Sequence, residues 1–179
     1  MEEISCSAIS KDEYFMDEAI REAEIAASEG EVPVGAVIVR DGEIIARAHN
    51  LVETLESSSA HAEMIAMHRA ETELGAKWLT GCTLYTTLEP CAMCAGAMVL
   101  ARIERLCIGT LYRKRSEHGL ALDIVQSREL NHRIEVSSGI REEECGRLLS
   151  EFFRRKRAEK AAARRAAADE NKQSEDVIR

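Results

Sequence analysis

The chain has 179 residues, of which 45% are hydrophobic and 31% charged, a balance that suits one globular domain with or without a tail. No apolar run reaches the length of a membrane-spanning helix, and the acidic first residues, 1–6, do not form a secretory signal. Six cysteines without an export signal do not predict a disulfide framework. The expected compartment is therefore the reducing cytoplasm, where paired cysteines more often hold metal.

The net charge of −8 is unevenly distributed along the chain. Seven basic residues and one acid lie between Phe152 and Arg165, so this window carries +6 and the rest of the chain carries −14. Such a run is typical of a solvated helix end, but a phosphate-binding patch needs the same charges. The sequence alone leaves both interpretations open.

Local signals predict helices and strands that alternate along the chain. Ser10 and Glu13 form a capping box, Asp41-Gly42 is a two-residue hairpin turn, and apolar residues recur at helical spacing over 145–153. In chain order, the predicted elements are a helix from Ser10 to Gly30, strands over 34–40 and 44–48, a helix from Ala60 to just before Gly75, a strand over 83–87, a helix from Pro90 to about Ala101, strands over 106–109 and 133–136, and a final helix through 145–153.

This order predicts an α/β fold with a mixed sheet that is antiparallel at one edge. Ser58 or Ser59 is expected to cap the second helix, and Pro90 to lie in the first turn of the third. The third helix is apolar nearly all round, so it should be buried or lie in an interface. Residues 110–122 are predicted to be irregular. The final helix should project from the core, with disorder after about residue 166.

His61, Cys91 and Cys94 form a candidate metal site. Both cysteines lie at a predicted helix start, whose positive end favours thiolates. Three protein ligands with one open position are typical of catalytic zinc, whereas structural zinc has four. Glu63, also in a first helical turn, can act beside the metal as the base that accepts a proton from water. A lone Cys-x-x-Cys also fits a redox pair, half a zinc ribbon or chance core cysteines, but the combination favours catalytic zinc.

The motif His61-Ala62-Glu63 followed by Pro90-Cys91-Ala92-Met93-Cys94 resembles the signature of the zinc deaminases of nucleobases. Over roughly residues 12–157, the chain resembles the bacterial tRNA adenosine deaminase family. The stretches that favour this branch are 130–133 and 144–154. The zinc motif alone fits the whole superfamily.

The resemblance implies a three-layer α/β/α cytidine-deaminase-like fold with a mixed central sheet. It implies a homodimer with one zinc per subunit, held by His61, Cys91 and Cys94. The deaminase domain is expected over residues 10–157, followed over 158–179 by a basic helix extension and a disordered tail.

The implied reaction is hydrolytic deamination of adenosine to inosine in tRNA, at the anticodon wobble position. Glu63 would shuttle protons from water to the ring and to the leaving amine. Asn50 matches a family asparagine that hydrogen-bonds the flipped nucleotide; without the resemblance it is a plain turn residue. The anticodon loop is single-stranded and therefore cheap to unstack. Contacts with the anticodon stem-loop are expected from the basic helix, at Phe152, Phe153, Arg154 and Arg155.

The chain departs from the family pattern at Ser57–Ser59 and over 112–120, where Tyr112 stands in place of an aspartate. In the family the second segment lies by the RNA. One alternative is therefore a deaminase of a free nucleobase or nucleoside, such as guanine, on the same fold; it would not need the basic helix. The other is a zinc-stabilised RNA-binding module, which would need a fourth protein ligand and would give Glu63 no task.

Overall fold

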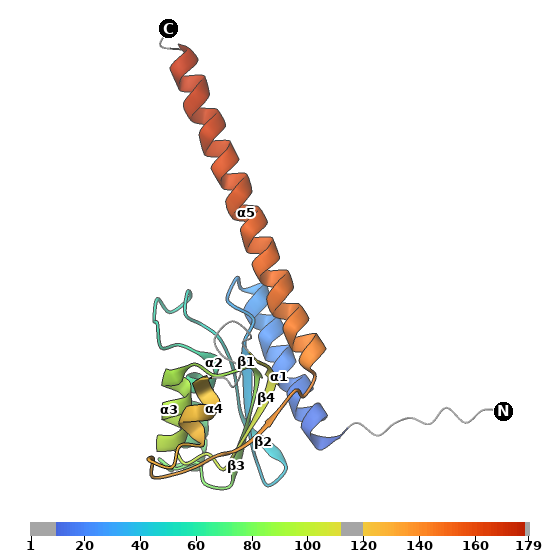
Figure 1. Ribbon diagram of the computed structural model, residues 1–179, viewed down its shortest axis with the longest axis vertical. Coiled ribbons are helices and arrows are strands. Elements are labelled where there is room, and N and C mark those ends of the chain that lie inside the picture. The colour runs from blue at the N-terminus through green and yellow to red at the C-terminus, as the bar shows by residue number, and fades with distance from the viewer. Residues whose placement is uncertain (1–9, 112–119, 178–179) are drawn as a thin grey trace, which may run out of the picture.

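The computed structural model describes residues 10–111 and 120–177 (Figure 1). In chain order, the elements are α1 (Lys11–Ser28), β1 (Gly35–Arg40), β2 (Glu43–His49), α2 (Ala62–Leu74), β3 (Cys82–Leu88), α3 (Ala92–Leu100), β4 (Arg105–Thr110), α4 (Leu120–Val125), β5 (Glu135–Ser138) and α5 (Glu142–Val177). Among the described residues, no helix combines the length and the apolar character needed to cross a lipid bilayer.

The strands form one mixed sheet in the order β2-β1-β3-β4-β5. β1 is antiparallel to both of its neighbours, with Val37 opposite Arg47 on β2 and opposite Tyr85 on β3. β3, β4 and β5 are parallel to one another. Consequently β2, β3, β4 and β5 all point in one direction and only β1 points in the other. The predicted mixed sheet with an antiparallel hairpin at one edge is confirmed.

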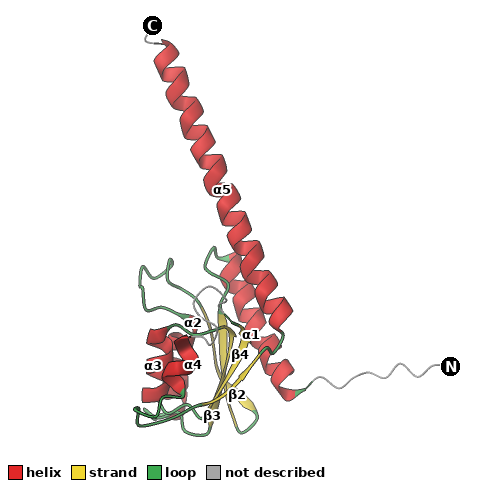
Figure 2. Cartoon of the chain, viewed as in Figure 1, coloured by secondary structure: helices red, strands yellow, loops and turns green. Residues whose placement is uncertain are grey.

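Helices cover both faces of the sheet, which confirms the predicted three layers (Figure 2). α1 and the first turns of α5 lie on one face, and α2, α3 and α4 lie on the other (Figure 1). Side chains alternate between the two cores, as the pleat of a strand requires. On β1, Val37 and Val39 pack with Phe15 and Met16 of α1, whereas Ile38 packs with the α2–α3 side.

α1 approaches β1 unusually closely at Gly35. A Cβ atom at this position would lie 2.0 Å from the carbonyl oxygen of Ala19 and 2.5 Å from the backbone nitrogen of Ala23. Both alanines are fully buried. The small residues of the helix and the glycine of the strand therefore set the distance between this layer and the sheet.

Two helices begin later than the sequence predicted. α2 has His61 as its N-cap, so neither Ser58 nor Ser59 caps it, and α3 has Cys91 as its N-cap, so Pro90 precedes the helix. Neither N-cap side chain makes a capping hydrogen bond, although both residues have the extended backbone of a cap. The reason is that these two side chains are turned toward each other, as described below.

α4 was not predicted, because residues 110–122 were expected to be irregular. Six residues are too few for a periodic signal, and the helix forms by packing Ala121 and Val125 into the core beside α3. The departures from the family pattern at 112–119 lie outside the described residues. β5 starts at Glu135, two residues later than predicted, because its register is fixed by pairing with Arg105 of β4.

α5 projects far beyond the rest of the molecule, as predicted (Figure 1). It continues as a helix to Val177, whereas disorder was predicted after about residue 166. That segment lacks large apolar residues, but it is rich in alanine and in charged residues with high helix propensity. Phe152 is buried and Phe153 is 42% exposed, so the apolar side of α5 ends at Phe152. The domain division at residue 157 stays a prediction.

Candidate active site

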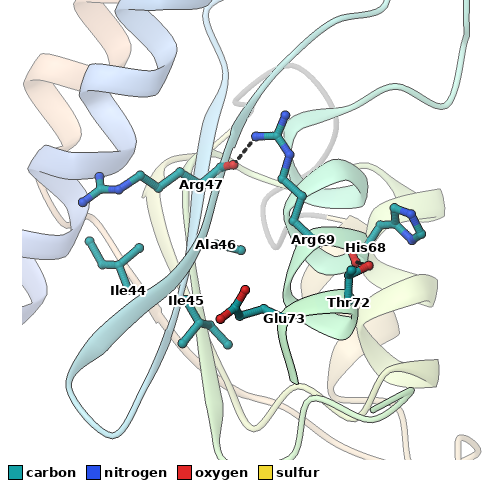
Figure 3. Close-up of a pocket in the computed structure, with 8 residues that line it drawn as sticks. All are labelled: Ile44, Ile45, Ala46, Arg47, His68, Arg69, Thr72 and Glu73. Carbon is teal, nitrogen blue, oxygen red and sulfur yellow. Dashed lines mark hydrogen bonds between the residues drawn. The ribbon is translucent and has the colours of Figure 1, made fainter. Parts of the chain in front are cut away.

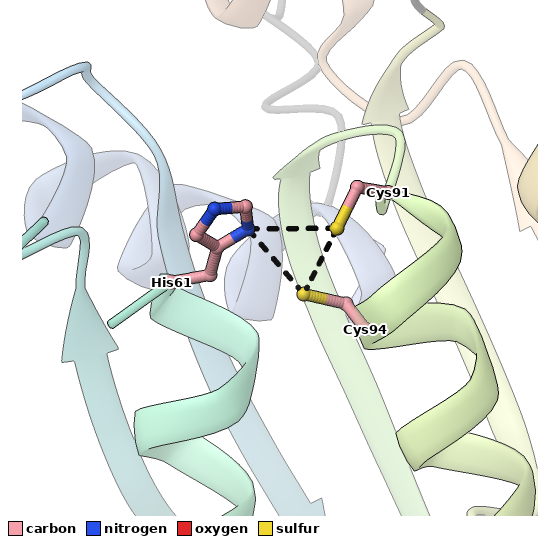
Figure 4. Close-up of side chains that lie close together, drawn as sticks. All are labelled: His61, Cys91 and Cys94. Carbon is pink, nitrogen blue, oxygen red and sulfur yellow. Dashed lines mark hydrogen bonds between the residues drawn. The ribbon is translucent and has the colours of Figure 1, made fainter. Parts of the chain in front are cut away.

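The side chains of His61, Cys91 and Cys94 converge where two helices begin (Figure 4). Nδ1 of His61 lies 3.6 Å from Sγ of Cys91 and 3.5 Å from Sγ of Cys94, and the two sulfur atoms are 3.6 Å apart. His61 comes from the start of α2, and the cysteines come from the start of α3. The structure thus brings together all three ligands predicted from the sequence.

This triangle of donor atoms has the size that zinc requires. A tetrahedral zinc ion, with bonds of about 2.3 Å to sulfur and about 2.0–2.1 Å to nitrogen, holds such atoms about 3.5–3.8 Å apart. One imidazole and two thiols are also a donor set that zinc prefers. His61 and Cys91 are partly exposed while Cys94 is buried, so a fourth ligand can approach from the solvent side.

The protein surroundings alone do not charge the Cys94 thiol. Burial raises the pKa of the Cys94 thiol, and the neighbouring Glu63 and Cys91 raise it further. A thiolate at this depth therefore needs a cation beside it. The donor set fits a bound metal better than it fits a free reactive thiol.

Glu63 lies in the first turn of α2 and is 3% exposed. Burial raises the pKa of its carboxyl, while its own backbone N–H, the His61 ring and the Cys94 thiol oppose this rise. The carboxyl group therefore stands beside the ligands rather than in solvent. The first helical turn lets residues two apart reach the same site, as expected from the sequence.

Asn50 follows β2 directly and is 6% exposed. Its Nδ2 donates to Oε2 of Glu31 at 2.9 Å. The next residue, Leu51, donates its backbone N–H to the carbonyl of Ala60, which directly precedes His61. Asn50 therefore lies at the same end of the sheet as the ligands. Sequence reasoning missed Glu31; the only signal was that the resemblance to the deaminase family, over roughly residues 12–157, also covers residues 31–37.

The residues predicted to contact RNA differ in their surroundings. Phe152 is buried under the guanidinium of Arg155, whose carbon lies 5.6 Å from the ring centroid. Arg155 also donates to the carbonyl of Ala27 at 3.1 Å, which ties α5 to the end of α1. Phe153 and Arg154 are exposed. Phe152 and Arg155 thus pack α5 against the body of the protein, whereas Phe153 and Arg154 are free to contact a partner.

The basic part of α5 leaves the body of the protein at the metal end. Arg155 is hydrogen-bonded to the carboxyl end of α1. Glu31 follows α1 in the chain and donates its backbone N–H to the carbonyl of Ala26 in that helix. Glu31 in turn bonds Asn50, whose neighbour Leu51 is bonded to the residue before His61. The charges beyond Arg155 therefore extend from the end of the sheet that carries the ligands (Figure 1).

A separate groove of about 460 Å³ lies between the edge strand β2 and α2 (Figure 3). Arg69 donates from its guanidinium to the carbonyl of Arg47 across this groove. A side chain that occupies an outward carbonyl makes an edge strand less available to other chains. The lining residues, none of which is a metal ligand, are Ile44, Ile45, Ala46, Arg47, His68, Arg69, Thr72 and Glu73.

One imidazole, two thiolates and a carboxyl that is not a ligand, all from helix starts, are the arrangement of the zinc deaminases. The same class is found by comparison with known families. Residues 9–110 match the family described as the cytidine and deoxycytidylate deaminase zinc-binding region. This stretch includes all three ligands and Glu63.

Similarity to individual proteins shows which family within this class the chain belongs to. The chain is 52% identical over 157 residues to the tRNA-specific adenosine deaminase of Bacillus subtilis (strain 168), with 88% of this chain and 98% of that protein covered. A solved structure from a study of tRNA:A34 deaminases at the wobble position is 40% identical, with a TM-score of 0.71, and covers 76% of this chain and 99% of that one. A guanine deaminase structure from Bacillus subtilis is also 40% identical, with a TM-score of 0.55, and covers 60% and 69%. The chain belongs to the tRNA-specific adenosine deaminase family, within the cytidine and deoxycytidylate deaminases.

The metal is expected to depend on the three converging residues and on no other cysteine. Purified protein should contain about one zinc per chain, because the triangle has one tetrahedral site. His61→Ala and Cys91→Ala should each lose it, as measured by elemental analysis after gel filtration. Cys107→Ala is the matched control, because Cys107 is also a buried free cysteine. Zinc that survives Cys94→Ala would contradict the ligand assignment.

Proposed function

We propose that this chain is a zinc-dependent hydrolase that deaminates adenosine to inosine in tRNA, at the wobble position of the anticodon. The observation that carries the proposal is the zinc-sized triangle of His61, Cys91 and Cys94 with the buried carboxyl of Glu63 beside it. Family membership supports tRNA as the substrate. The relative from Bacillus subtilis, of which 98% is covered, is a tRNA-specific adenosine deaminase.

In this mechanism the three ligands hold the ion, and Glu63 moves protons. The ion that His61, Cys91 and Cys94 would hold would act as a Lewis acid and make a water molecule nucleophilic toward C6 of adenine. Two thiolate ligands would neutralise the formal charge of the ion and acidify its water less than neutral ligands would, so a base beside the site, Glu63, becomes useful. Glu63 accepts one proton from the water and delivers it to N1 of the ring. It then passes the proton of the new C6 hydroxyl group to the amine, so that the C6–N bond breaks, ammonia leaves and inosine remains. Asn50 binds the target nucleoside.

The basic helix favours RNA over a free base. Arg154, Arg157 and Lys160 are exposed on α5 at the metal end of the molecule, where the stem of an anticodon hairpin would lie when its loop enters the site. A deaminase of free guanine would not need these charges. The guanine deaminase structure is also covered less completely by this chain than the tRNA deaminase structure.

A homodimer is also part of the proposal. α3 exposes apolar side chains on its outer surface, with Leu100 80% exposed and Met93 38% exposed. Apolar residues exposed together on one helix are typical of a protein interface. The cytoplasm is the proposed compartment, because tRNA is processed there. Sedimentation velocity of the purified protein tests the dimer, which a single species of monomer mass would contradict.

The function is tested by incubating the purified protein with total tRNA and analysing the nucleosides by mass spectrometry. Inosine should appear and adenosine should fall by the same amount. Free guanine, assayed in parallel, should remain. Conversion of guanine without formation of inosine would replace the proposal with the free-base alternative.

The salt dependence of RNA binding should decrease when the exposed charges of α5 are removed. In the triple variant Arg154→Gln, Arg157→Gln and Lys160→Gln, the slope of log Kd against log salt for an anticodon stem-loop should flatten by about 0.7–0.9 for each phosphate that is no longer neutralised. Folding should be unaffected, because none of these side chains makes a described contact with the body of the protein. Binding is measured by fluorescence anisotropy at several salt concentrations.

The matched control removes three cations at the opposite end of the sheet. Lys77, Arg102 and Arg128 lie in the connections that lead into β3, β4 and β5, and all three are exposed. Their replacement by glutamine should leave the salt slope unchanged. Equal slopes for both triple variants would show that the charges of α5 do not contact RNA.

A further inference from the structure

Glu31 carries a buried carboxylate that the mechanism above does not use. It lies between α1 and β1 and is 0% exposed. Three donors converge on it: Nδ2 of Asn50 at 2.9 Å, and the backbone N–H groups of Glu53 at 3.3 Å and Thr54 at 2.7 Å. Burial alone would raise the pKa of this carboxyl, but the hydrogen bonds from Thr54, Glu53 and Asn50 outweigh it and lower the pKa. Glu31 is therefore a charged group inside the protein.

This carboxylate fixes which way the Asn50 amide points. An ionised carboxylate only accepts hydrogen bonds, so the NH2 group of the amide must face Glu31 and the oxygen must face away from it. Within the described part of the chain, Oδ1 of Asn50 has no hydrogen-bond partner, and no buried side-chain polar atom lacks one. Oδ1 is therefore open to solvent, and thus to a bound substrate.

The same carboxylate holds the loop that leads to the first metal ligand. Glu53 and Thr54 lie in the connection between β2 and α2, residues 50–61. The two ends of this connection are joined by the bond from Leu51 to Ala60, one residue before His61. One buried charge thus determines both the orientation of a substrate-binding amide and the path of the loop beside the metal.

We propose that Glu31 is a positioning residue of the deamination site, which presents the oxygen of Asn50 as a hydrogen-bond acceptor to the substrate nucleoside. The proposal rests on the proposed function, in which Asn50 contacts that nucleoside. The site then requires a donor group on the nucleoside at this point. Reversing the Asn50 amide would present NH2 instead and would leave its oxygen facing the carboxylate of Glu31, with no proton between them.

The test begins with Glu31→Gln, which keeps the shape and removes the charge. With Oε1 of the new amide accepting from Thr54, its NH2 would face Asn50, and the Asn50 amide would turn over. kcat/KM for the anticodon stem-loop should fall by roughly tenfold to a hundredfold, as expected for a misplaced substrate contact. Zinc content should stay near that of the wild type, whereas the melting temperature should fall by a few degrees, because the backbone N–H of Glu53 loses its acceptor. Glu56→Gln, an exposed glutamate in the same loop, is the matched control.

Exchanging donor and acceptor provides the decisive comparison. Asn50→Asp alone should also lose activity, because two carboxylates then face each other. In the double variant Glu31→Gln with Asn50→Asp, the new NH2 donates to the new carboxylate, and an oxygen again faces the substrate. The double variant should therefore be at least several-fold more active than either single variant. A merely structural role of Glu31 predicts the opposite, namely reductions in activity that add.

The outcomes separate this proposal from the proposed function. If the wild type forms no inosine, the proposed function fails before any variant is compared. If the wild type is active, wild-type kcat/KM in Glu31→Gln, or a double variant no better than the worse single variant, overturns the role of Glu31. If Glu31→Gln does not fold, Asn50→Asp is compared with Asn50→Ala. Greater activity in the aspartate variant would then overturn the proposal, and lower activity would support it.

Discussion

Glu63→Ala is expected to lower kcat for deamination by a factor of about 10²–10⁴, the usual contribution of a positioned general acid and base. Zinc should be retained, because the ligand atoms come from His61, Cys91 and Cys94 alone. The fold should survive, because the variant removes a carboxyl group that is costly to bury and puts alanine, the best helix former, in the first turn of α2. Single-turnover kinetics with an anticodon stem-loop, together with zinc analysis of the same sample, measure both quantities.

Glu73→Ala is the matched control for this prediction. Glu73 lies on the same helix but is exposed, and its carboxyl group lines the groove at β2 rather than the metal centre. Its loss should change kcat less than about twofold to threefold, within the ordinary range of surface substitutions. A zinc-loaded Glu63→Ala protein with near wild-type kcat would show that another group moves the proton.

Gly35→Ala is expected to destabilise the fold by about 3 kcal/mol or more, at or above the upper end of the usual range for overpacking. The added methyl group would meet the backbone of α1 at Ala19 and Ala23, and backbone cannot rotate away as a flexible side chain can. α1 would have to move off the sheet along its buried face. Urea unfolding, monitored by circular dichroism, measures the free energy of unfolding.

The control is Gly146→Ala in α5. There the nearest atom to an added Cβ is Oγ1 of Thr110 at 3.7 Å, an ordinary contact distance. Alanine inside a helix is more favourable than glycine by about 1 kcal/mol, so this variant should be as stable as the wild type or slightly more stable. Equal stability of the two variants would mean that α1 does not rest on Gly35 as closely as described.

The elements predicted correctly are those whose signals are local. The capping box at Ser10 and Glu13 starts α1, and Asp41 and Gly42 make the turn between β1 and β2 with positive φ at both residues. The ligand set was also predictable, because the spacing of Cys91 and Cys94 already places both thiols on the first turn of one helix. In each case the sequence within a few residues determines the structure.

The features that were missed depend on contacts between distant residues. His61 and Cys91 cap their helices without a capping bond because their side chains meet each other across 30 positions. Glu31 resembles a surface glutamate by its neighbours in the sequence. Only the fold brings the donors of Asn50, Glu53 and Thr54 around it. No periodicity or propensity predicts such a convergence.

Because β2, β3, β4 and β5 point in one direction, the two ends of the sheet have different roles, and we expect substitutions at the two ends to affect different properties. The connections that leave these strands at their carboxyl ends carry Asn50, His61 and the cysteine ligands, whereas the described connections that enter at the amino ends carry no metal ligand. Substitutions that alter substrate choice can therefore accumulate at one end while the packing of the sheet is conserved. To redirect this enzyme to a new nucleobase, a library of variants should be confined to the loops at the carboxyl ends of the strands, because all of its members keep the same packed sheet.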